Sequence, residues 1–285
     1  MLALYDVPAP AKLNLFLHIT GQRADGYHLL QSVFMLIDWC DTLHFERCSS
    51  HNITREDLGP KLPDEDLTVK AARALQAATG CRQGVHIGVS KSVPAQAGMG
   101  GGSSDAATTL LALNRLWGLK LPRPALEKIG LALGADVPFF LRGHNAWVEG
   151  IGETITPLEK AHQLPSACFA VVKPVAGLET KSIFASPSLK RDSDSATILG
   201  FAAAHFDFGR NDLQPVAQAL CPEVTEAINW LGIRGLQARM TGSGSAVFAK
   251  MAHAIDLSGA PKGWQVKACD NLMVHPLAGW ASDQN

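Results

Sequence analysis

The sequence predicts a mixed α/β chain that folds in two halves. Its 285 residues are 47% apolar and 18% charged, which is typical of a globular protein with a sizeable core. Stretches of alternating apolar residues, typical of strands, are interleaved with stretches of helical period in both halves. A proline-bounded stretch at 157–165 is typical of a linker. We therefore expect domains at residues 1–157 and 158–285.

The first clear element is a strand at residues 11–19. Its odd positions are all apolar, and its even positions are polar except Phe16. This period of two predicts a half-buried strand. It places Lys12 and Asn14 on one face, opposite the core.

The rest of the chain alternates strands and helices. Glycine just past a helical pattern, as at Gly80 and Gly118, predicts the end of a helix, and a residue before proline, as at Val137, leaves the helical region. Further strands are expected at 29–37, 84–89, within 145–156, at 168–172 and in a strand–loop–strand at 237–250. Helices are expected at 67–78, 106–117, 124–133, 180–185, 196–205 and 223–231, with one more capped by Asp212, and loops at 21–26 and 49–66.

Charge and cysteine content exclude several classes of protein. The net charge is −1, from 25 basic and 26 acidic side chains, whereas a protein that holds a phosphate backbone carries a basic excess. No stretch approaches the ~18 consecutive apolar residues of a membrane-spanning helix, and we see no secretory signal at the start. The cysteines form no CxxC pair and predict buried, reduced thiols, so we expect a cytoplasmic protein.

A glycine-serine loop at 98–104 carries the strongest chemical signal. It lies between a predicted strand and a predicted helix, and Ser103, Ser104 and Asp105 are types that begin helices. Free N–H groups and the helix dipole favour a phosphate at such a place. The loop is neither a P-loop nor a good dinucleotide fingerprint, since GxxxxGK[ST] is absent and Ser103 replaces the third glycine. The alternative interpretation is a tight or flexible turn.

Two further features gain weight only in combination. Asp136, in GADVPFF, is a candidate general base toward a hydroxyl, although alone it fits a turn aspartate better. Lys12 alone fits a solvated lysine, but a lysine close to an aspartate holds it ionised and stabilises developing charge. The Gly-Ser-Gly-Ser stretch at 242–245 fits an ordinary turn and a substrate contact equally well.

The order of these motifs resembles that of the GHMP small-molecule kinases over residues 8–250, in the branch whose acceptor is a cytidine diphosphate alcohol. The motifs that carry the resemblance are PAKLNLFL, DGYH, GMGGGSSDAA, ADVPFF, NDL and MTGSGSAVF. The resemblance implies an α+β fold in two domains. The first is ribosomal-S5-like with a left-handed crossover, an exception to the usual hand, and the second is ferredoxin-like.

The resemblance also implies transfer of the γ-phosphoryl group of ATP to a 2-hydroxyl of the acceptor, with Mg²⁺ bridging the phosphates. Asp136 then is the general base, Lys12 its electrostatic partner, and Asn14 their neighbour at the accepting hydroxyl. Ser104 is a candidate metal ligand from its place at the helix start. A monomer or weak homodimer acting on a small molecule, without nucleic acid or membrane, is expected.

Other positions are carried over from the family for nucleotide and base binding. Tyr27 and Phe184 match aromatic residues that enclose the cytosine, and His28 matches a contact to the pyrimidine edge; core packing is the alternative for the two aromatic residues. The ATP-binding positions implied are Asp66, Lys91, Pro94, Ala95, Gln96, Ala97, Gly98, Met99, Gly100, Gly101, Gly102, Ser103 and Ser104.

Two departures from the family pattern bear on the nucleotide side. The family loop begins Pro-x-Gly-Gly-Gly, whereas this chain has Gln96 and Ala97 in place of two of the glycines. Asp66 stands where an asparagine commonly contacts adenine, and a carboxylate cannot donate a hydrogen bond as an amide does.

Three alternative functions stay open at this stage. The nearest is a GHMP kinase for homoserine, mevalonate or a sugar, against which the aromatic residues argue, because a non-aromatic acceptor needs no stacking pair. The others are a non-catalytic RNA-binding protein on an S5-like fold, and an inactive kinase homologue. The neutral charge argues against the former, and the presence of both Lys12 and Asp136 against the latter.

Overall fold

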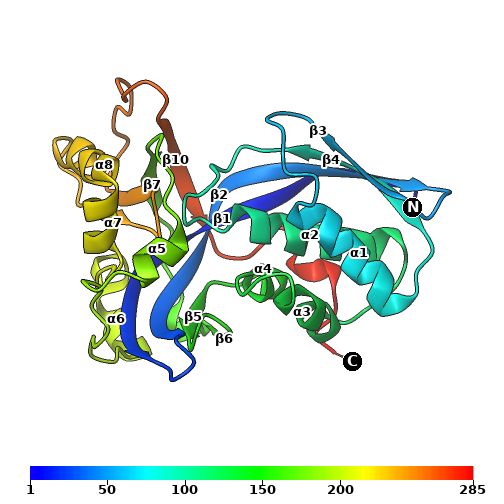
Figure 1. Ribbon diagram of the computed structural model, residues 1–285, viewed down its shortest axis with the longest axis horizontal. Coiled ribbons are helices and arrows are strands. Elements are labelled where there is room, and N and C mark those ends of the chain that lie inside the picture. The colour runs from blue at the N-terminus through cyan, green and yellow to red at the C-terminus, as the bar shows by residue number, and fades with distance from the viewer. Residues whose placement is uncertain (285) are drawn as a thin grey trace.

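A long, curved antiparallel hairpin runs through the computed structural model, which describes residues 1–284 (Figure 1). Its strands are β1 (Ala3–Gln22) and β2 (His28–Cys48), and bulges shift their register at four places. β2 also pairs with β4 (Gly84–Ser90) and β5 (Ala146–Glu149). β3 (Ile53–Asp57) lies parallel to β4, and β6 (Thr154–Pro157) completes this part of the sheet beside β5. The hairpin thus pairs directly with β4 and β5, and through them it is joined to β3 and β6.

Four helices cover one face of this sheet. They are α1 (Leu67–Thr79), α2 (Gly101–Leu116), α3 (Arg123–Leu131) and α4 (Val137–Arg142). α1 connects the parallel strands β3 and β4, so this is the crossover unit of the first half. Asp66 caps its start by accepting the N–H of Val69, and Gly80 ends it in the left-handed conformation.

The second half is a four-stranded antiparallel sheet in the order β10-β7-β9-β8. Its strands are β7 (Cys168–Lys173), β8 (Arg239–Met240), β9 (Val247–Met251) and β10 (Gln265–Leu272). Its helices are α5 (Thr180–Phe184), α6 (Ile198–Ala204), α7 (Gln214–Leu220) and α8 (Pro222–Gly232). Short 3₁₀ turns occur at Lys160–His162, His205–Asp207 and Ala278–Trp280.

β10 joins the two halves into one continuous sheet. One end pairs with β7, and the other end reaches β2, where Asn271 lies opposite Ile37. A bridge between Leu17 of β1 and Asn211 adds a second link. The two halves are therefore held in a fixed relation by backbone hydrogen bonds.

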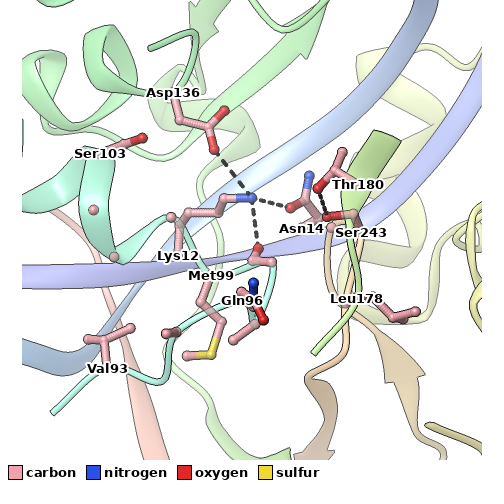
Figure 2. A pocket seen from close by; sticks show the side chains of 18 of the residues that line it. Lys12, Asn14, Val93, Gln96, Met99, Ser103, Asp136, Leu178, Thr180 and Ser243 are labelled. Carbon is pink, nitrogen blue, oxygen red and sulfur yellow. Dashed lines mark hydrogen bonds and ion pairs between the residues drawn. The ribbon is translucent and has the colours of Figure 1, made fainter. Parts of the chain in front are cut away.

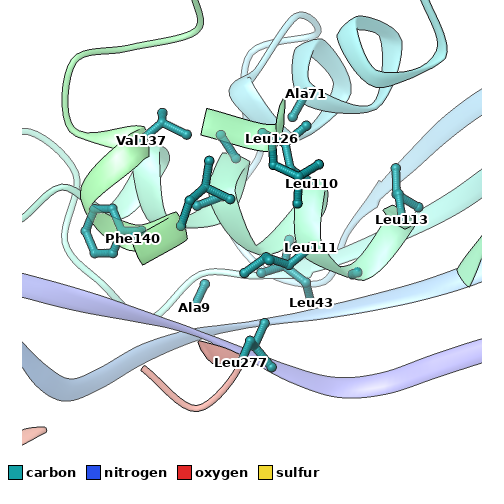
Figure 3. Packing of buried hydrophobic residues seen from close by; sticks show 14 of the residues in the cluster. Ala9, Leu43, Ala71, Leu110, Leu111, Leu113, Leu126, Val137, Phe140 and Leu277 are labelled. Atoms are coloured by element: carbon teal, nitrogen blue, oxygen red, sulfur yellow. The ribbon is translucent and has the colours of Figure 1, made fainter. Parts of the chain in front are cut away.

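Three clusters of buried apolar side chains fill the molecule. One lies between the sheet and helices α1–α4 (Figure 3), and another lies beneath α7 and α8. The third lies between the halves and includes Phe16, Phe169 and Phe201 together with Ala97 and Met99 of the glycine loop. This loop is therefore anchored in the core that both halves share.

The structure confirms the predicted α+β class and most elements. The helices expected at 67–78, 124–133 and 223–231 correspond to α1, α3 and α8, and the strand at 84–89 corresponds to β4. The predicted loop at 49–66 is wrong over β3, and the sequence reading missed α4 and β10 altogether. β3 and α4 are short, and the stability of all three elements comes from pairing and packing with distant residues rather than from local pattern.

Three more specific predictions are wrong. α2 begins at Gly101, not at the serines, because Gly100 is the N-cap in the left-handed conformation. Asp212 does not cap α7; its carboxylate instead accepts the N–H of Ile19. Lys12 and Asn14 share a side of β1 as predicted, but both are buried rather than opposite the core, because the glycine loop and the second half cover that face.

No helix of residues 1–284 is long and apolar enough to cross a membrane. All six cysteines are free thiols, as predicted, although only Cys221 and Cys269 are buried.

The first core cluster gives a stability prediction. Leu110 of α2 is fully buried within it, beside residues of α1, α3 and α4. We expect Leu110→Ala to lower the free energy of unfolding by about 2–5 kcal/mol, because it removes packed methyl groups and leaves a cavity. Leu131→Ala, at a leucine that is 51% exposed, should change it by no more than about 0.5 kcal/mol. Chemical denaturation measures both, and equal losses would contradict this packing.

Candidate active site

A cavity of about 900 Å³ opens where the two halves meet. β1 supplies Lys12 and Asn14 to its wall, the loop before α2 supplies residues 93–100, the start of α2 supplies 101–103, and Asp136 lies at the start of α4. The second half contributes 178–181, Phe184 and 242–244. The cavity thus brings together the three features that the sequence singled out.

Lys12 lies at the centre of this site (Figure 2). Its ammonium donates to the carbonyl of Gly98 at 3.0 Å and to Oδ1 of Asn14, and lies 3.8 Å from Oδ2 of Asp136. The ring of Phe34 lies 4.6 Å below the ammonium. Burial lowers the pKa of Lys12, and the nearby carboxylate of Asp136 opposes that shift. The predicted lysine–aspartate pair is therefore present, with the lysine shielded from solvent.

Asn14 is held in one orientation by both halves. Its side-chain N–H₂ donates to the hydroxyl of Ser32 at 2.9 Å, which leaves Oδ1 to face Lys12. Its backbone N–H donates to the hydroxyl of Thr241 at 2.8 Å. Asn14 and Lys12 thus form one fixed unit beside the cavity.

Asp136 is the exposed member of the pair. It is the N-cap residue of α4, yet its carboxylate makes no capping hydrogen bond. Its side chain is 30% exposed and lines the cavity. A carboxylate that is open to a ligand and uncommitted to the helix can accept a proton from a hydroxyl.

The glycine loop packs against the second half at close range. A Cβ on Gly98 would lie 2.4 Å from the carbonyl oxygen of Thr241, and Gly98 has a φ of +71°. The backbone N–H of Lys12 donates to the carbonyl of Met99 at 2.9 Å. The loop ends at the start of α2, whose free N–H groups and dipole favour an anion.

Gln96 and Ala97, which replace two glycines of the family pattern, still form a tight loop. Gln96 has a φ of +49°, a conformation that glycine adopts without strain. Ala97 is buried, and the carbonyls of Gln96 and Ala97 accept the N–H groups of Ser245 and Ala246 at 3.2 and 3.3 Å. The stretch at 242–245 is therefore more than a turn, because it supports the loop and lines the cavity.

A buried charge cluster lies beneath the loop, and the sequence reading missed one of its members. Lys91 donates to the carboxylates of Asp41 and Asp105, at 2.5 Å for the latter. The carboxylate of Asp41 also accepts the N–H groups of Ser92 and Val93 at 2.6 and 2.8 Å. Burial raises the pKa of Asp105 to about 7, against the lowering effect of Lys91. Asp41 fixes the first residues of the loop, and no local motif marks it.

Asp66 lines the cavity, but its carboxylate already has partners. It accepts the N–H of Val69 at 3.1 Å and the hydroxyl of Thr68 at 2.8 Å, and it pairs with Arg55 at 2.9 Å. Asp66 thus caps α1 and forms an ion pair with the guanidinium of Arg55.

The aromatic residues expected to enclose a base are only partly assembled. Phe184 lines the cavity, and the rings of Phe184 and His28 have centroids 5.1 Å apart at an angle of 36°. Tyr27 is 60% exposed and does not line the cavity, so core packing is excluded for it. The structure therefore brings His28 and Phe184 together and leaves Tyr27 outside.

Within residues 1–284, no group of three or more histidine, cysteine, aspartate or glutamate side chains is placed to hold a metal ion. The hydroxyl of Ser104 and Oδ1 of Asp105 are buried without a hydrogen-bond partner. Ser104 lies in the first turn of α2, next to the loop, and Asp105 directly follows that turn.

The loop geometry gives a prediction with a matched control. Gly98→Ala should weaken ATP binding about tenfold or more, since a Cβ there meets backbone and strains the left-handed conformation by ~1–3 kcal/mol. Gly232→Ala lies at the end of α8, outside the cavity lining, and its Cβ meets no atom within 4 Å, so ATP affinity should stay within about twofold. Calorimetric titration with ATP measures both. Equal affinities for the two variants would show that the loop does not hold the nucleotide.

Comparisons with known proteins agree with this geometry. The family model of the GHMP kinases N terminal domain matches residues 66–144, and that of the GHMP kinases C terminal domain matches residues 195–253. A relative from Paracidovorax citrulli, named 4-diphosphocytidyl-2-C-methyl-D-erythritol kinase, is 73% identical over 285 residues and covers all of both chains. One from Delftia acidovorans with the same name is 68% identical, again over the whole of both.

Solved structures share the fold. A crystal structure of 4-(cytidine 5′-diphospho)-2C-methyl-D-erythritol kinase has a TM-score of 0.75 at 34% identity, and the match covers 86% of this chain and 89% of that one. The mevalonate kinase of Methanococcus jannaschii has a TM-score of 0.67 at 14% identity, with 95% and 98% covered. In domain order, sequence and fold, the chain belongs to the GHMP kinase family.

Proposed function

We propose that this protein transfers the γ-phosphoryl group of ATP to the 2-hydroxyl of 4-diphosphocytidyl-2-C-methyl-D-erythritol, giving the 2-phosphate and ADP. The step belongs to the non-mevalonate route to isoprenoids. The observation that carries the proposal is the meeting of Lys12, Asp136 and the glycine loop in one cavity. Full-length relatives at 63–73% identity, all named for this reaction, support this acceptor.

The residues at the cavity divide the work of phosphoryl transfer. Asp136 accepts the proton of the acceptor hydroxyl, and a carboxylate suffices because the loose transition state demands little early proton removal. Lys12 stands 3.8 Å away and stabilises the negative charge that spreads over the transferred group. Asn14 keeps the ammonium in place from the opposite side. Most of the catalysis is then positioning and charge stabilisation.

The loop and the start of α2 hold the phosphates of ATP. Their N–H groups and the helix dipole favour the anion, and the anchored Met99 and Ala97 keep the loop in shape. We propose that Mg²⁺ accompanies the nucleotide, neutralises phosphate charge and keeps several of its waters. The hydroxyl of Ser104, which has no hydrogen-bond partner, would be a suitable ligand for Mg²⁺.

We place the base of the acceptor at the far end of the cavity, against Phe184 and His28. Tyr27 closes over the base from its present exposed position in this proposal. We also propose a division into domains at 1–157 and 158–285, which fits the interval between the end of β6 at Pro157 and the start of β7 at Cys168. A cytoplasmic monomer or weak homodimer, without nucleic acid or membrane partners, completes the proposal.

A coupled assay of ADP release with Mg·ATP tests the function directly. Turnover is expected with 4-diphosphocytidyl-2-C-methyl-D-erythritol and not with homoserine, mevalonate or galactose in parallel reactions. Turnover with one of the others instead would keep Lys12, Asp136 and the loop in their roles and reject the acceptor. Absence of turnover with all four acceptors would reject the kinase proposal.

The proposed base gives a sharper prediction. Asp136→Asn keeps the volume of the side chain and removes its charge, so kcat should fall by at least ~10²-fold, the usual contribution of a general base. The KM values for ATP and acceptor should stay within a few-fold, because the loss is confined to the transition state. Asp256→Asn, at an exposed aspartate of the second half that does not line the cavity, is the matched control. Unchanged kcat in Asp136→Asn would remove Asp136 from catalysis.

A further inference from the structure

We propose that Arg191 is a positioning residue for the base of the acceptor: it holds His28 as the neutral imidazole that carries its proton on Nδ1, beside the ring of Phe184. The inference rests on the proposed function, because the ligand is the pyrimidine of that acceptor. It adds a residue outside the sequence motifs and assigns a direction to the hydrogen bond that His28 offers.

One guanidinium ties together His28 and Phe184, of which Phe184 lines the cavity. Nε of Arg191 donates to Nε2 of His28 at 3.0 Å. Nη2 donates to the carbonyls of Phe184 and Ser186 at 3.2 and 2.8 Å, and Nη1 to that of Leu189 at 3.0 Å. Arg191 therefore fixes the end of α5 and the first residue of β2 relative to each other.

The contact with Arg191 determines where the proton of His28 resides. A guanidinium has only donors, so Nε2 must act as the acceptor. A neutral imidazole with Nε2 as acceptor carries its proton on Nδ1. Arg191 and burial also lower the pKa of His28, which keeps the ring neutral. Nδ1 has no hydrogen-bond partner among residues 1–284, so its N–H is available to a ligand.

The surroundings of Arg191 argue that this contact is more than a surface ion pair. Within the described part of the chain no carboxylate pairs with it, and the adjacent Asp192 pairs with Lys190 at 2.7 Å instead. All its partners are three carbonyls and one imidazole. The guanidinium is thus committed to the segment 184–189 and to His28.

An N–H donor beside an aromatic face selects among pyrimidines. Uracil shares the acceptor at O2 with cytosine but presents an N–H at N3, where cytosine presents an acceptor, so our proposal places Nδ1–H against N3 of the base. A donor that faces another donor leaves both without a partner, and such mismatches discriminate more strongly than differences in size. The ring of Phe184 supplies stacking that either base receives equally. The arrangement therefore favours cytosine over uracil through the proton on Nδ1.

Nitrogen NMR of histidine-labelled protein tests the tautomer without any substrate. The His28 signals, assigned with His28→Gln, should show a protonated Nδ1 and an unprotonated Nε2 in the unaltered protein. Arg191→Met removes the guanidinium and retains the apolar stem, and should move the proton population toward Nε2. Lys190→Met, at the neighbouring exposed cation, should leave the His28 signals unchanged. A proton on Nε2 in the unaltered protein, or no change in Arg191→Met, would overturn the proposal.

Kinetics provide the second readout. In Arg191→Met, the KM for the acceptor should rise about tenfold while kcat and the KM for ATP stay within about twofold. Cytidine 5′-diphosphate should inhibit more strongly than uridine 5′-diphosphate when each competes with the acceptor, and this preference should shrink at least fivefold in Arg191→Met. Equal inhibition of the unaltered protein by both would overturn the inference.

The two proposals fail in different ways. If the acceptor is phosphorylated normally by Arg191→Met, the inference about Arg191 is wrong and the kinase proposal stands. If the unaltered protein phosphorylates none of the acceptors, yet cytidine 5′-diphosphate perturbs the His28 signals and Arg191→Met abolishes that effect, the base site stands and the kinase proposal is wrong. A fall in kcat equal to the rise in KM would indicate general misfolding and would overturn the positioning role.

Discussion

The site depends on one buried ammonium group. A charge removed from water is tolerated only when nearby groups replace its hydration, and Lys12 is 4% exposed. Its neighbours come from β1 through Asn14, from the glycine loop through Gly98, from β2 through the Phe34 ring and from the start of α4 through Asp136. Asn14, Gly98 and Asp136 each present to the ammonium an oxygen with partial or full negative charge. The ammonium therefore fixes the relative placement of elements that are far apart in the sequence.

This arrangement also explains why the two halves share one sheet. Thr241 and the glycines at 242 and 244 support Asn14 and the loop from the second half, so a shift of one half would break the environment of Lys12. β10 prevents such a shift, because it pairs with β7 on one side and β2 on the other. Ala97 and Met99, which are buried in the core that both halves share, also oppose such a shift. The cavity is consequently built on packed elements, which preserves its geometry between turnovers.

How far the sequence predicts this structure depends on the range of the interactions involved. Alternation along β1 places Lys12 and Asn14 on one side of the strand, because that relation is local. It does not predict their burial, because the residues that cover them lie more than 80 positions away in the sequence. Asp41 is beyond prediction for the same reason, since its role is defined by Lys91 and Asp105. The start of α2 was misplaced because the left-handed Gly100 caps the helix in place of a side chain. Tyr27 lies on an exposed turn, whose conformation carries no periodic signal.

The fold alone does not select the acceptor. The mevalonate kinase from Methanococcus jannaschii shares this fold at 14% identity. Phosphoryl transfer asks mainly for held phosphates and a stabilised charge, and in the proposed function Lys12, Asp136 and the loop meet that demand for any hydroxyl that reaches them. Selection among acceptors therefore belongs to the other end of the cavity. There, Arg191 turns an otherwise ambiguous imidazole into a donor of defined direction, next to the ring of Phe184. In this proposal, Arg191, which lies outside the recognised motifs, links the end of α5 in the second half to recognition of the base.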